Sequence, residues 1–436
     1  MTTTTMTNTA AETTTDSLEL AKKAKLSKQY EECEALCSQA LQADPNNIAA
    51  YQLLGALYFE QGMLDKAADS YVKAAGIDNN QPAIHFQLGR IAERQKRLDD
   101  AASSYSYAIQ LNEKDYRPRQ SLGQVQFVQK SYDRAVESFE KAIALESPDA
   151  WVRHRLGLIA QQQERYEEAK RYFEEAISLN NKNAKFHTAL GNLHFNQEDW
   201  NAAAEAYRKA AKLDDSLYQV HLRLGQIAQR QDKKSAAVNF FEKAIAIKPE
   251  DYKAHQLLAD VYAARRTLDL AKIHYLKSAE LGNQTPSVRF KLGQISQQEK
   301  NYEKAVQYFK EAVELNAQNP NFHLSLGDVY LEQNNIAAAK ESYKKAAAIN
   351  SQTPAIPFRV GLVAQKEGDT TLAISSYQKA IAMEARPQFY YHMGEAYAAQ
   401  NNPSEALKSY RKALEMNPNL SVAKQAVDKL RSQGYQ

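Results

Sequence analysis

The sequence has few of the residues and segments that mark secreted, membrane-bound or metal-dependent proteins. It contains only two cysteines in 436 residues, which is typical of a protein in a reducing compartment. It has no apolar run long enough to cross a bilayer, and it does not open with a basic and then apolar segment. We therefore expect neither a membrane anchor nor a signal peptide, and these absences favour a cytoplasmic location.

Strong net charge and catalytic motifs are lacking as well. The formal net charge is +3, which is too small to indicate binding to nucleic acid or membranes by itself. The sequence has no phosphate-binding loop, no nucleophile elbow and no HExxH zinc motif. We therefore expect a non-catalytic protein with no cofactor and no metal site. The apolar content of 44% is that of a folded chain.

What the sequence does contain is a Leu-Gly dipeptide that recurs every 34 residues. It is first seen at Leu54-Gly55 and ends as Met393-Gly394, where the last step is 33 residues. Self-similarity at this period indicates stacked structural repeats instead of one globular core. We number twelve repeats so that the dipeptide falls at places 7 and 8. Their first residues are 14, 48, 82, 116, 150, 184, 218, 252, 286, 320, 354 and 387.

Small and aromatic residues follow two helical faces within each repeat. Place 24 is Tyr or Phe in every repeat except the first, and place 27 is Ala in every repeat except at Ser278. Places 20, 24 and 27 share one face of a helix, on which alanines allow close approach and the ring fills the space beside them. Places 4, 7, 8 and 11 form the matching face of an earlier helix. The pattern predicts two antiparallel helices per repeat, with a turn near places 15–17.

These residues resemble the tetratricopeptide repeat family over residues 14–420. The resemblance implies an all-α fold, a right-handed α-solenoid superhelix of antiparallel helix pairs, with a concave groove lined by the first helix of each repeat. We expect residues 1–13 to be a disordered Thr-rich tail. The 33-residue step near Glu384–Pro387 should perturb the stacking of repeats, and Pro357 at place 4 fits the helical frame least well.

The end of the chain, residues 421–436, is expected to form a capping helix and a short tail. Ser421 would cap this helix at its N-terminus. An apolar stripe would cover repeat twelve. The predicted stripe consists of Val422, Ala426, Val427 and Leu430.

In the family, places 2, 5, 6, 9, 12 and 13 face the groove. In repeats three to nine these places hold nine cations and twelve glutamines, against only Glu93 and Asp260. We predict that this basic, Gln-rich groove makes the chain a scaffold or adaptor for proteins or peptides with acidic or extended segments. The predicted groove residues are Arg155, Arg223, Lys291 and Arg359, with Arg90, Arg117 and Arg230, for charge, Gln161, Gln229 and Gln297 for peptide groups, and Trp151, Phe127 and Phe195 for apolar contact.

Other interpretations stay open at this point. The cations can equally belong to a solvated surface or pair with carboxylates of the neighbouring repeats. The chain can also be the recruiting or regulatory subunit of an enzyme complex such as a glycosyltransferase or a secretion or assembly machine. Self-association through the convex face or the open ends is a further alternative. RNA binding would need a base-reading code and a stronger positive charge, so we expect no nucleic-acid partner.

Two groups of residues look like metal ligands but hold packing places. Cys33 and Cys37 are four residues apart, at the core places 20 and 24 of repeat one, and no further ligand follows at a suitable spacing. Five of the nine histidines fall at place 4, which is a packing place. They are His85, His187, His221, His255 and His323. We expect both groups in the core.

Overall fold

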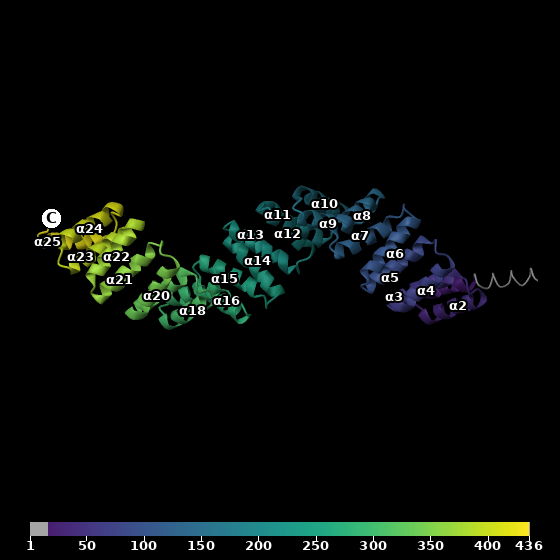
Figure 1. The fold of residues 1–436 in the computed structure, drawn as a ribbon, viewed down its shortest axis with the longest axis horizontal. Helices are drawn as coiled ribbons and strands as arrows, with labels where there is room; N and C mark the ends of the chain where they lie inside the picture. The colour runs from purple at the N-terminus through teal and green to yellow at the C-terminus, as the bar shows by residue number, and fades with distance from the viewer. Residues whose placement is uncertain (1–15, 436) are drawn as a thin grey trace, which may run out of the picture. The chain divides into compact units, whose positions relative to one another are not determined.

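The computed structural model describes residues 16–435, which are helical with no strand in this range. The predicted tail, residues 1–13, lies outside the described residues. The structure divides after Asp215 into two compact units, which we call the first block (residues 16–215) and the second block (residues 216–435). Consecutive helices pack as antiparallel pairs in each block (Figure 1). The predicted all-α repeat fold is confirmed.

The first helix of each repeat, here the A helix, occupies places 1 to 13, except that α21 lies one place later. In repeat one it covers residues 16–26. The other A helices of the first block are α3 (Ile48–Glu60), α5 (Pro82–Arg94), α7 (Tyr116–Val128), α9 (Ala150–Gln162) and α11 (Ala184–Asn196). Those of the second block are α13 (Tyr218–Arg230), α15 (Tyr252–Ala264), α17 (Pro286–Gln298), α19 (Pro320–Glu332), α21 (Ala355–Glu367) and α23 (Pro387–Ala399).

The second helix of each repeat, here the B helix, begins at place 17, so the turn lies about one place earlier than expected. The B helices of the first block are α2 (Tyr30–Ala43), α4 (Leu64–Ile77), α6 (Leu98–Leu111), α8 (Tyr132–Ala144), α10 (Tyr166–Leu179) and α12 (Trp200–Leu213). Those of the second block are α14 (Lys234–Ile247), α16 (Leu268–Glu280), α18 (Tyr302–Leu315), α20 (Ile336–Ile349), α22 (Thr370–Met383) and α24 (Pro403–Met416), followed by the final helix α25 (Ser421–Ser432).

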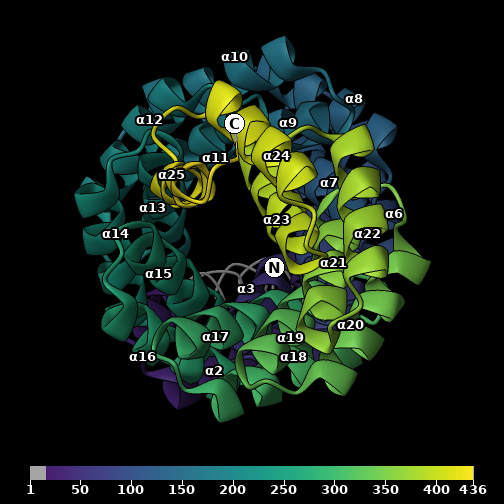
Figure 2. The same cartoon turned by 90° about the vertical axis from the view of Figure 1, so that its left-hand side faces the viewer.

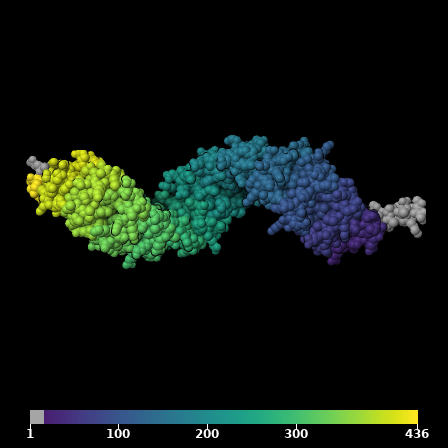
Figure 3. Space-filling view, in the orientation of Figure 1, coloured from purple at the N-terminus to yellow at the C-terminus, as the bar shows by residue number. Residues whose placement is uncertain are grey.

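The A and B helices lie on opposite sides of each block. In the first block, α7, α9 and α11 lie on the inner side of the curved ribbon and α8, α10 and α12 on its outer side (Figure 2). In the second block, α13 and α15 are likewise inside, whereas α14 and α16 are outside. Within each block the colours follow the chain in order along the surface (Figure 3), because each repeat packs mainly on its two neighbours.

The recurring glycine at place 8 is explained by the aromatic ring at place 24 of the same repeat. A Cβ atom built on Gly157 would lie 2.5 Å from the ring of Phe173, and the glycines at the same place of the other repeats face rings at similar distances. The ring therefore lies directly against the backbone of the A helix. Repeat one has a smaller pair at these places, Ala21 and Cys37, and both are fully buried.

The histidines at place 4 hold the linkers between repeats. The Nε2 atom of His85 lies 2.9 Å from the backbone oxygen of Asn79, six residues earlier. His187, His255 and His323 make the same contact at 2.9 to 3.1 Å. All five histidines predicted to pack are buried, so this prediction is confirmed.

The 33-residue spacing between repeats eleven and twelve is accommodated by a short linker between their helices. α22 ends at Met383 and α23 begins at Pro387, so the linker is residues 384–386. Phe358 and Phe389, whose ring centroids are 4.6 Å apart, still stack across it, much as Phe290 and Phe322 do at 4.9 Å. The predicted perturbation of stacking is therefore wrong at this contact.

Two details of the sequence interpretation need correction. Pro357 lies in the first turn of α21, where backbone N–H groups have no partner within the helix, so it is well tolerated. Ser421 is the first residue of α25 and does not cap it, because Leu420 occupies the N-cap position. Val422 is 43% exposed, whereas Val427 and Leu430 pack against the core of repeat twelve.

Candidate functional site

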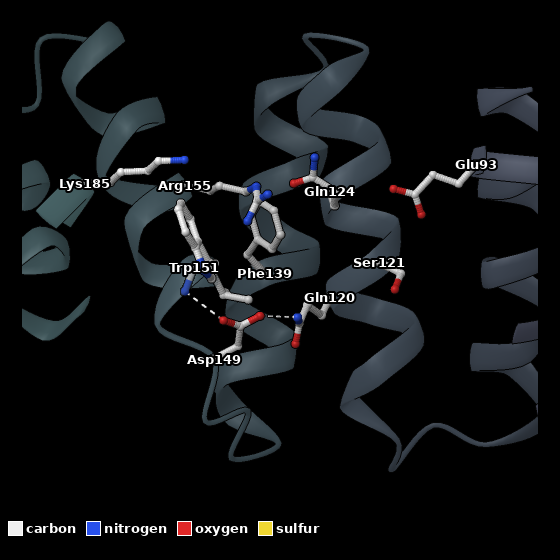
Figure 4. A pocket seen from close by; sticks show the side chains of 10 residues that line it. Glu93, Gln120, Ser121, Gln124, Phe139, Asp149, Trp151, Arg155 and Lys185 are labelled. Carbon is white, nitrogen blue, oxygen red and sulfur yellow. Dashed lines mark hydrogen bonds between the residues drawn. The ribbon is translucent and has the colours of Figure 1, made fainter. Parts of the chain in front are cut away.

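A pocket of about 510 Å³ opens on the A-helix side of the first block. It spans four successive A helices, α5, α7, α9 and α11, and the ring of Phe139 on α8 contributes to its lining (Figure 4). Of the predicted groove residues, it brings together Arg155 and Trp151. The polar and charged side chains around it are Glu93, Gln120, Ser121, Gln124, Asp149, Arg155 and Lys185.

Arg155 is the cation held most deeply in this pocket. It lies at place 6 of α9 and is partly buried, and no carboxylate forms an ion pair with it among residues 16–435. Burial lowers the pKa of Arg155, while the more distant charges of Asp149 and Glu93 act in the opposite direction. A guanidinium that is partly removed from water without an anionic partner is a costly arrangement that a ligand can relieve.

The ring of Trp151 lies close to two cations, Arg155 and Lys185. The ring is half-buried and meets Phe186 of α11 edge-on at a centroid distance of 4.9 Å, which fixes its orientation. The guanidinium carbon of Arg155 lies 5.8 Å from the ring centroid, and Nζ of the exposed Lys185 lies 5.7 Å from it. These contacts are within the range of cation–π attraction. The ring and both cations therefore form one positively charged wall.

The acidic residues of the pocket have different roles. Asp149 is the N-cap of α9: its carboxylate accepts a hydrogen bond from the backbone N–H of Trp151 at 2.8 Å and another from the side-chain amide of Gln120. It is thus committed to the scaffold. Glu93, on α5, accepts a hydrogen bond from the Tyr105 hydroxyl through Oε2 at 2.8 Å. It gives the pocket a negative side opposite Arg155 and Lys185 (Figure 4).

Gln124 lies between these two sides. In Figure 4 it stands between Arg155 and Glu93, on α7. Its Oε1 atom is buried and has no hydrogen-bond partner among the described residues. A buried amide oxygen without a donor costs on the order of 1–3 kcal/mol. The Gln124 amide therefore gains a hydrogen bond at this oxygen only if it turns and brings the oxygen into the pocket that the side chain lines.

Family models for the tetratricopeptide repeat match most of the chain. They cover residues 24–85, 86–150, 154–217, 218–251, 297–356 and 387–420. The chain belongs to the tetratricopeptide repeat family. Proteins of this family are generally scaffolds that bind other proteins or peptides, and membership supports a protein-interaction role for the chain in these general terms.

Several solved structures resemble this tetratricopeptide repeat protein. "Crystal structure of APC/C hetero-tetramer Cut9-Hcn1" has 15% identity and a TM-score of 0.43 and covers 95% of both chains. YrrB, described as a TPR protein with an unusual peptide-binding site, has 18% identity and a TM-score of 0.35, over 51% of this chain and 98% of its own. PilF of Pseudomonas aeruginosa has 20% identity and a TM-score of 0.41, over 49% and 96%. No curated protein matched the chain.

Two other features of the tetratricopeptide repeat protein bear on its chemistry. Cys33 and Cys37 are buried and not disulfide-bonded, and burial raises the pKa of Cys37 to about 12, so their predicted place in the core is confirmed. Among residues 16–435, no cluster of His, Cys, Asp or Glu is arranged to hold a metal ion. None of the described helices combines the length and apolar character needed to cross a membrane.

The other predicted cations of the first block contact their own surroundings. Arg90 donates a hydrogen bond to Gln87 at 3.0 Å, and its guanidinium carbon lies 4.8 Å from the ring centroid of Phe59. Arg117 forms an ion pair of 2.6 Å with Asp115, the N-cap of its own helix. Neither residue lines the pocket around Arg155.

Two of the predicted cations of the second block lie beside carboxylates. Arg359 binds Asp328 with two parallel hydrogen bonds of 2.5 and 2.7 Å, and Asp328 also accepts one from the Tyr343 hydroxyl at 2.7 Å. Lys291 is exposed, and its charge acts on Asp260 of the preceding repeat. The interpretation that groove cations pair with carboxylates of neighbouring repeats therefore holds at Arg359, whose partner Asp328 lies in the preceding repeat.

Arg223 and Arg230 are both on α13. Arg223 is partly buried and donates a hydrogen bond to Gln226 at 3.3 Å. Arg230 is exposed and is the last residue of the helix.

The predicted glutamine and phenylalanine contacts lie outside the pocket. Gln161 and Gln229 are partly buried near the ends of their A helices, and Gln297, placed likewise, donates a hydrogen bond to Glu332 at 3.4 Å. The rings of Phe127 and Phe195 lie at place 12 and meet the first residues of the following B helices, Tyr132 and Trp200, at 6.0 and 5.2 Å. These two rings therefore help to hold A and B helices together.

Of the ten residues that line the pocket, the sequence interpretation listed only Trp151 and Arg155 as site residues, and the omitted ones include Lys185, Gln124, Glu93 and Asp149. Lys185 and Gln124 lie at groove places 2 and 9, so the repeat frame already contained the signal for them. Glu93 was counted only as an opposing charge. Asp149 had a different signal, an Asp directly before a predicted helix. Only the packing of α5, α7, α9 and α11 shows that these four side chains surround one pocket.

Proposed function

We propose that the first block binds an extended, acidic segment of a partner protein at Arg155, Lys185 and Trp151. The observation that supports this most directly is the partly buried guanidinium of Arg155, which has no ion pair among residues 16–435. A carboxylate of the partner can accept two parallel hydrogen bonds from it, a geometry that guanidinium groups favour. Lys185 adds a second positive charge on the same side.

The pocket also offers the contacts that a peptide backbone and an apolar side chain need. The Gln124 amide lines the pocket and can turn its unsatisfied Oε1 atom towards a backbone N–H of the segment. The half-buried ring of Trp151 provides an apolar surface of the kind that dominates binding energy at interfaces. Carboxylate, backbone and side chain of one short segment would thus each find a partner.

The arrangement of the pocket favours an extended segment. It crosses four A helices, α5 to α11, which at a usual helix separation of about 10 Å span roughly 30 Å. An extended chain advances about 3.3 Å per residue, so about nine residues cover this distance. A compact partner surface would not follow the inner side of the block as closely.

The proposal is tested by selecting random 12-residue peptides on the full-length protein and on Arg155→Gln. The selected peptides are then measured by fluorescence anisotropy at low and high salt. We expect Asp and Glu to be enriched among peptides bound by the natural chain, and Arg155→Gln to weaken their binding at least tenfold. Lys141→Gln, an exposed position on α8, removes the same charge outside the pocket and is the matched control.

The salt dependence of binding and the comparison with the control variant decide whether the proposal holds. Binding should weaken as salt is added, because charge pairing at a partly exposed site is screened. The proposal is overturned if the natural chain selects no acidic peptides, or if Arg155→Gln and Lys141→Gln weaken binding equally. Circular dichroism of both variants checks that the helical fold is retained.

A further inference from the structure

We infer that this pocket recognises a segment with two charges in a fixed order, a basic side chain against Glu93 and an acidic side chain against Arg155 and Lys185. This inference rests on the proposed function and deepens it. It follows from the charged side chains that line the pocket: Glu93 on α5, none on α7, and Arg155 and Lys185 on α9 and α11. The remaining lining carboxylate, Asp149, is engaged by the backbone of α9 and by Gln120. Figure 4 shows Glu93 and Lys185 at opposite ends, with Gln124 and Arg155 between them.

Glu93 is suited to accept a cation from outside the chain. Its Oε2 atom accepts the Tyr105 hydroxyl at 2.8 Å, which fixes the carboxylate. No Lys or Arg forms an ion pair with it among residues 16–435, although Arg90 and Arg94 are on the same helix. The guanidinium carbons of these two arginines lie instead over the ring of Phe59, at 4.8 and 4.2 Å from its centroid. The Oε1 atom of Glu93 therefore remains available for a partner's ammonium or guanidinium group.

A comparison with Asp328 shows what a committed carboxylate looks like. Asp328 also accepts a tyrosine hydroxyl, that of Tyr343, but it binds Arg359 with both oxygens as well. Glu93 has the hydroxyl contact without the cation. A tyrosine hydroxyl holds each of these two carboxylates in place. Asp328 already has its cation, whereas at Glu93 a ligand can supply one.

The two charged sides determine which segments bind well. A uniformly acidic segment that places one carboxylate at Arg155 brings another towards Glu93, and like charges brought together across an interface oppose binding. A segment with a basic residue at that end avoids this repulsion and gains an ion pair. Because the pocket has only one negative side, exchanging the basic and acidic residues of such a segment must weaken its binding.

The test uses Glu93→Gln, which keeps the size of the side chain and an oxygen that can accept the Tyr105 hydroxyl. Random 12-residue peptides are selected on the full-length natural chain, on Glu93→Gln and on the control Lys141→Gln. We expect the natural chain to select peptides that contain a basic residue, Lys or Arg, together with an acidic residue, Asp or Glu. From Glu93→Gln we expect peptides that keep the acidic residues and lose the enrichment in basic ones.

Synthetic peptides then quantify the effect. The best bipolar peptide, its version with the two charges exchanged and a version with only the acidic residues are compared by anisotropy. Glu93→Gln should weaken the bipolar peptide about fivefold to tenfold and strengthen the acidic one. The inference is overturned if Glu93→Gln selects the same peptides as the natural chain, or if exchanging the charges leaves the affinity unchanged.

This result is distinguishable from failure of the proposed function. If acidic peptides are selected and depend on Arg155 but not on Glu93, the proposed function stands and the bipolar inference falls. If neither Arg155→Gln nor Glu93→Gln changes the selected peptides, both fall.

Discussion

The two blocks use the same three places of the repeat for different purposes. The places are 9 and 24 of one repeat and 6 of the next. They hold Gln124, Phe139 and Arg155 in the first block, and Asp328, Tyr343 and Arg359 in the second. In the second block the hydroxyl, carboxylate and guanidinium form one hydrogen-bonded group. In the first block the amide and the phenylalanine provide neither the charge nor the hydroxyl, and the arginine faces a pocket.

The electrostatics of the two arginines differ accordingly. Burial lowers the pKa of Arg155. Burial would lower the pKa of Arg359 too, but its hydrogen bonds and charge contact with Asp328 outweigh this and raise it. The comparison teaches that a groove arginine is a candidate ligand-binding residue only where the preceding repeat does not supply a carboxylate. Charge counted along the sequence overestimates the number of available cations.

The largest effect is expected from charge reversal at the two arginines. Arg155→Glu should weaken binding of acidic peptides about 100-fold, because it removes a favourable pair and adds repulsion. It should leave the thermal stability nearly unchanged. Arg359→Glu should do the reverse, lowering stability by about 2–4 kcal/mol because it places two carboxylates together, with little effect on peptide binding. Anisotropy and urea unfolding measure the two outcomes, and equal losses of binding in both variants would remove the distinction between the blocks.

The next largest effect should come from closing the first-block site with a carboxylate. Gln124→Asp places at position 9 the residue found at Asp328, and it should pair with Arg155. We expect peptide affinity to fall about tenfold, because the guanidinium is then occupied, while the melting temperature rises slightly. The paired variant Asp328→Gln should destabilise the second block instead. Affinity that stays unchanged in Gln124→Asp would show that Arg155 is not the residue that binds the peptide.

A smaller effect, on the pH dependence of stability, is expected at His154. This residue lies at place 5 of repeat five, where repeat eleven of the second block has Phe358. Burial, followed by the nearby charges of Arg155 and Lys185, lowers the pKa of His154 to about 4. A histidine in an unfolded chain titrates near pH 6.5. Its neutral form is therefore favoured by folding, and the stability that this form contributes is present above about pH 6.5 and is lost as the pH falls towards 4.

His154→Phe should remove this pH dependence. At pH 7.5 the variant and the natural chain should differ little, whereas at pH 5 the variant should be more stable by about 1–2 kcal/mol. Urea unfolding at both pH values measures this. The reverse change, Phe358→His, is the matched control in the second block and should introduce a similar loss at low pH. A constant difference between His154→Phe and the natural chain at the two pH values would contradict the assigned burial.

The smallest effect is expected at the tyrosine hydroxyl of the second block. Tyr343→Phe removes the hydrogen bond to Asp328 but leaves the ion pair with Arg359, so unfolding should become easier by about 1 kcal/mol. Phe139→Tyr in the first block is the complementary change. Its hydroxyl can donate to the unsatisfied Oε1 atom of Gln124, as the Tyr207 hydroxyl donates to Asn192 at the same two places at 2.7 Å, so it should stabilise by up to about 1 kcal/mol. Thermal unfolding of both variants is the measurement, and no gain in stability for Phe139→Tyr would show that the hydroxyl needs a carboxylate partner.

Much of the fold follows from local signals in the chain. The place-8 glycines and place-24 rings predicted the helix pairs because their contact lies within one repeat, so spacing alone brings them together. Pro357 and Ser421 were misjudged because the sequence does not fix the exact first residue of a helix: α21 begins at Ala355, one place later than the other A helices, and α25 already includes Ser421. Within the candidate site, Arg155 and Trp151 could be selected from the sequence because they hold groove places. Their proximity to Glu93 could not be predicted from the sequence, because Glu93 comes from a different repeat.

By itself, the sequence determined the repeat, the two helices in each copy and the face on which the cations lie, because these depend on periodicities within about 34 residues. Only the tertiary structure decided which cations are engaged. Place 6 of one repeat meets place 9 of the preceding one through the packing of neighbouring A helices, and the side chain found there either neutralises the arginine, as Asp328 does, or leaves it facing a pocket, as Gln124 does. The physical reason is that an ion pair depends on distances of a few ångströms between side chains more than 30 residues apart.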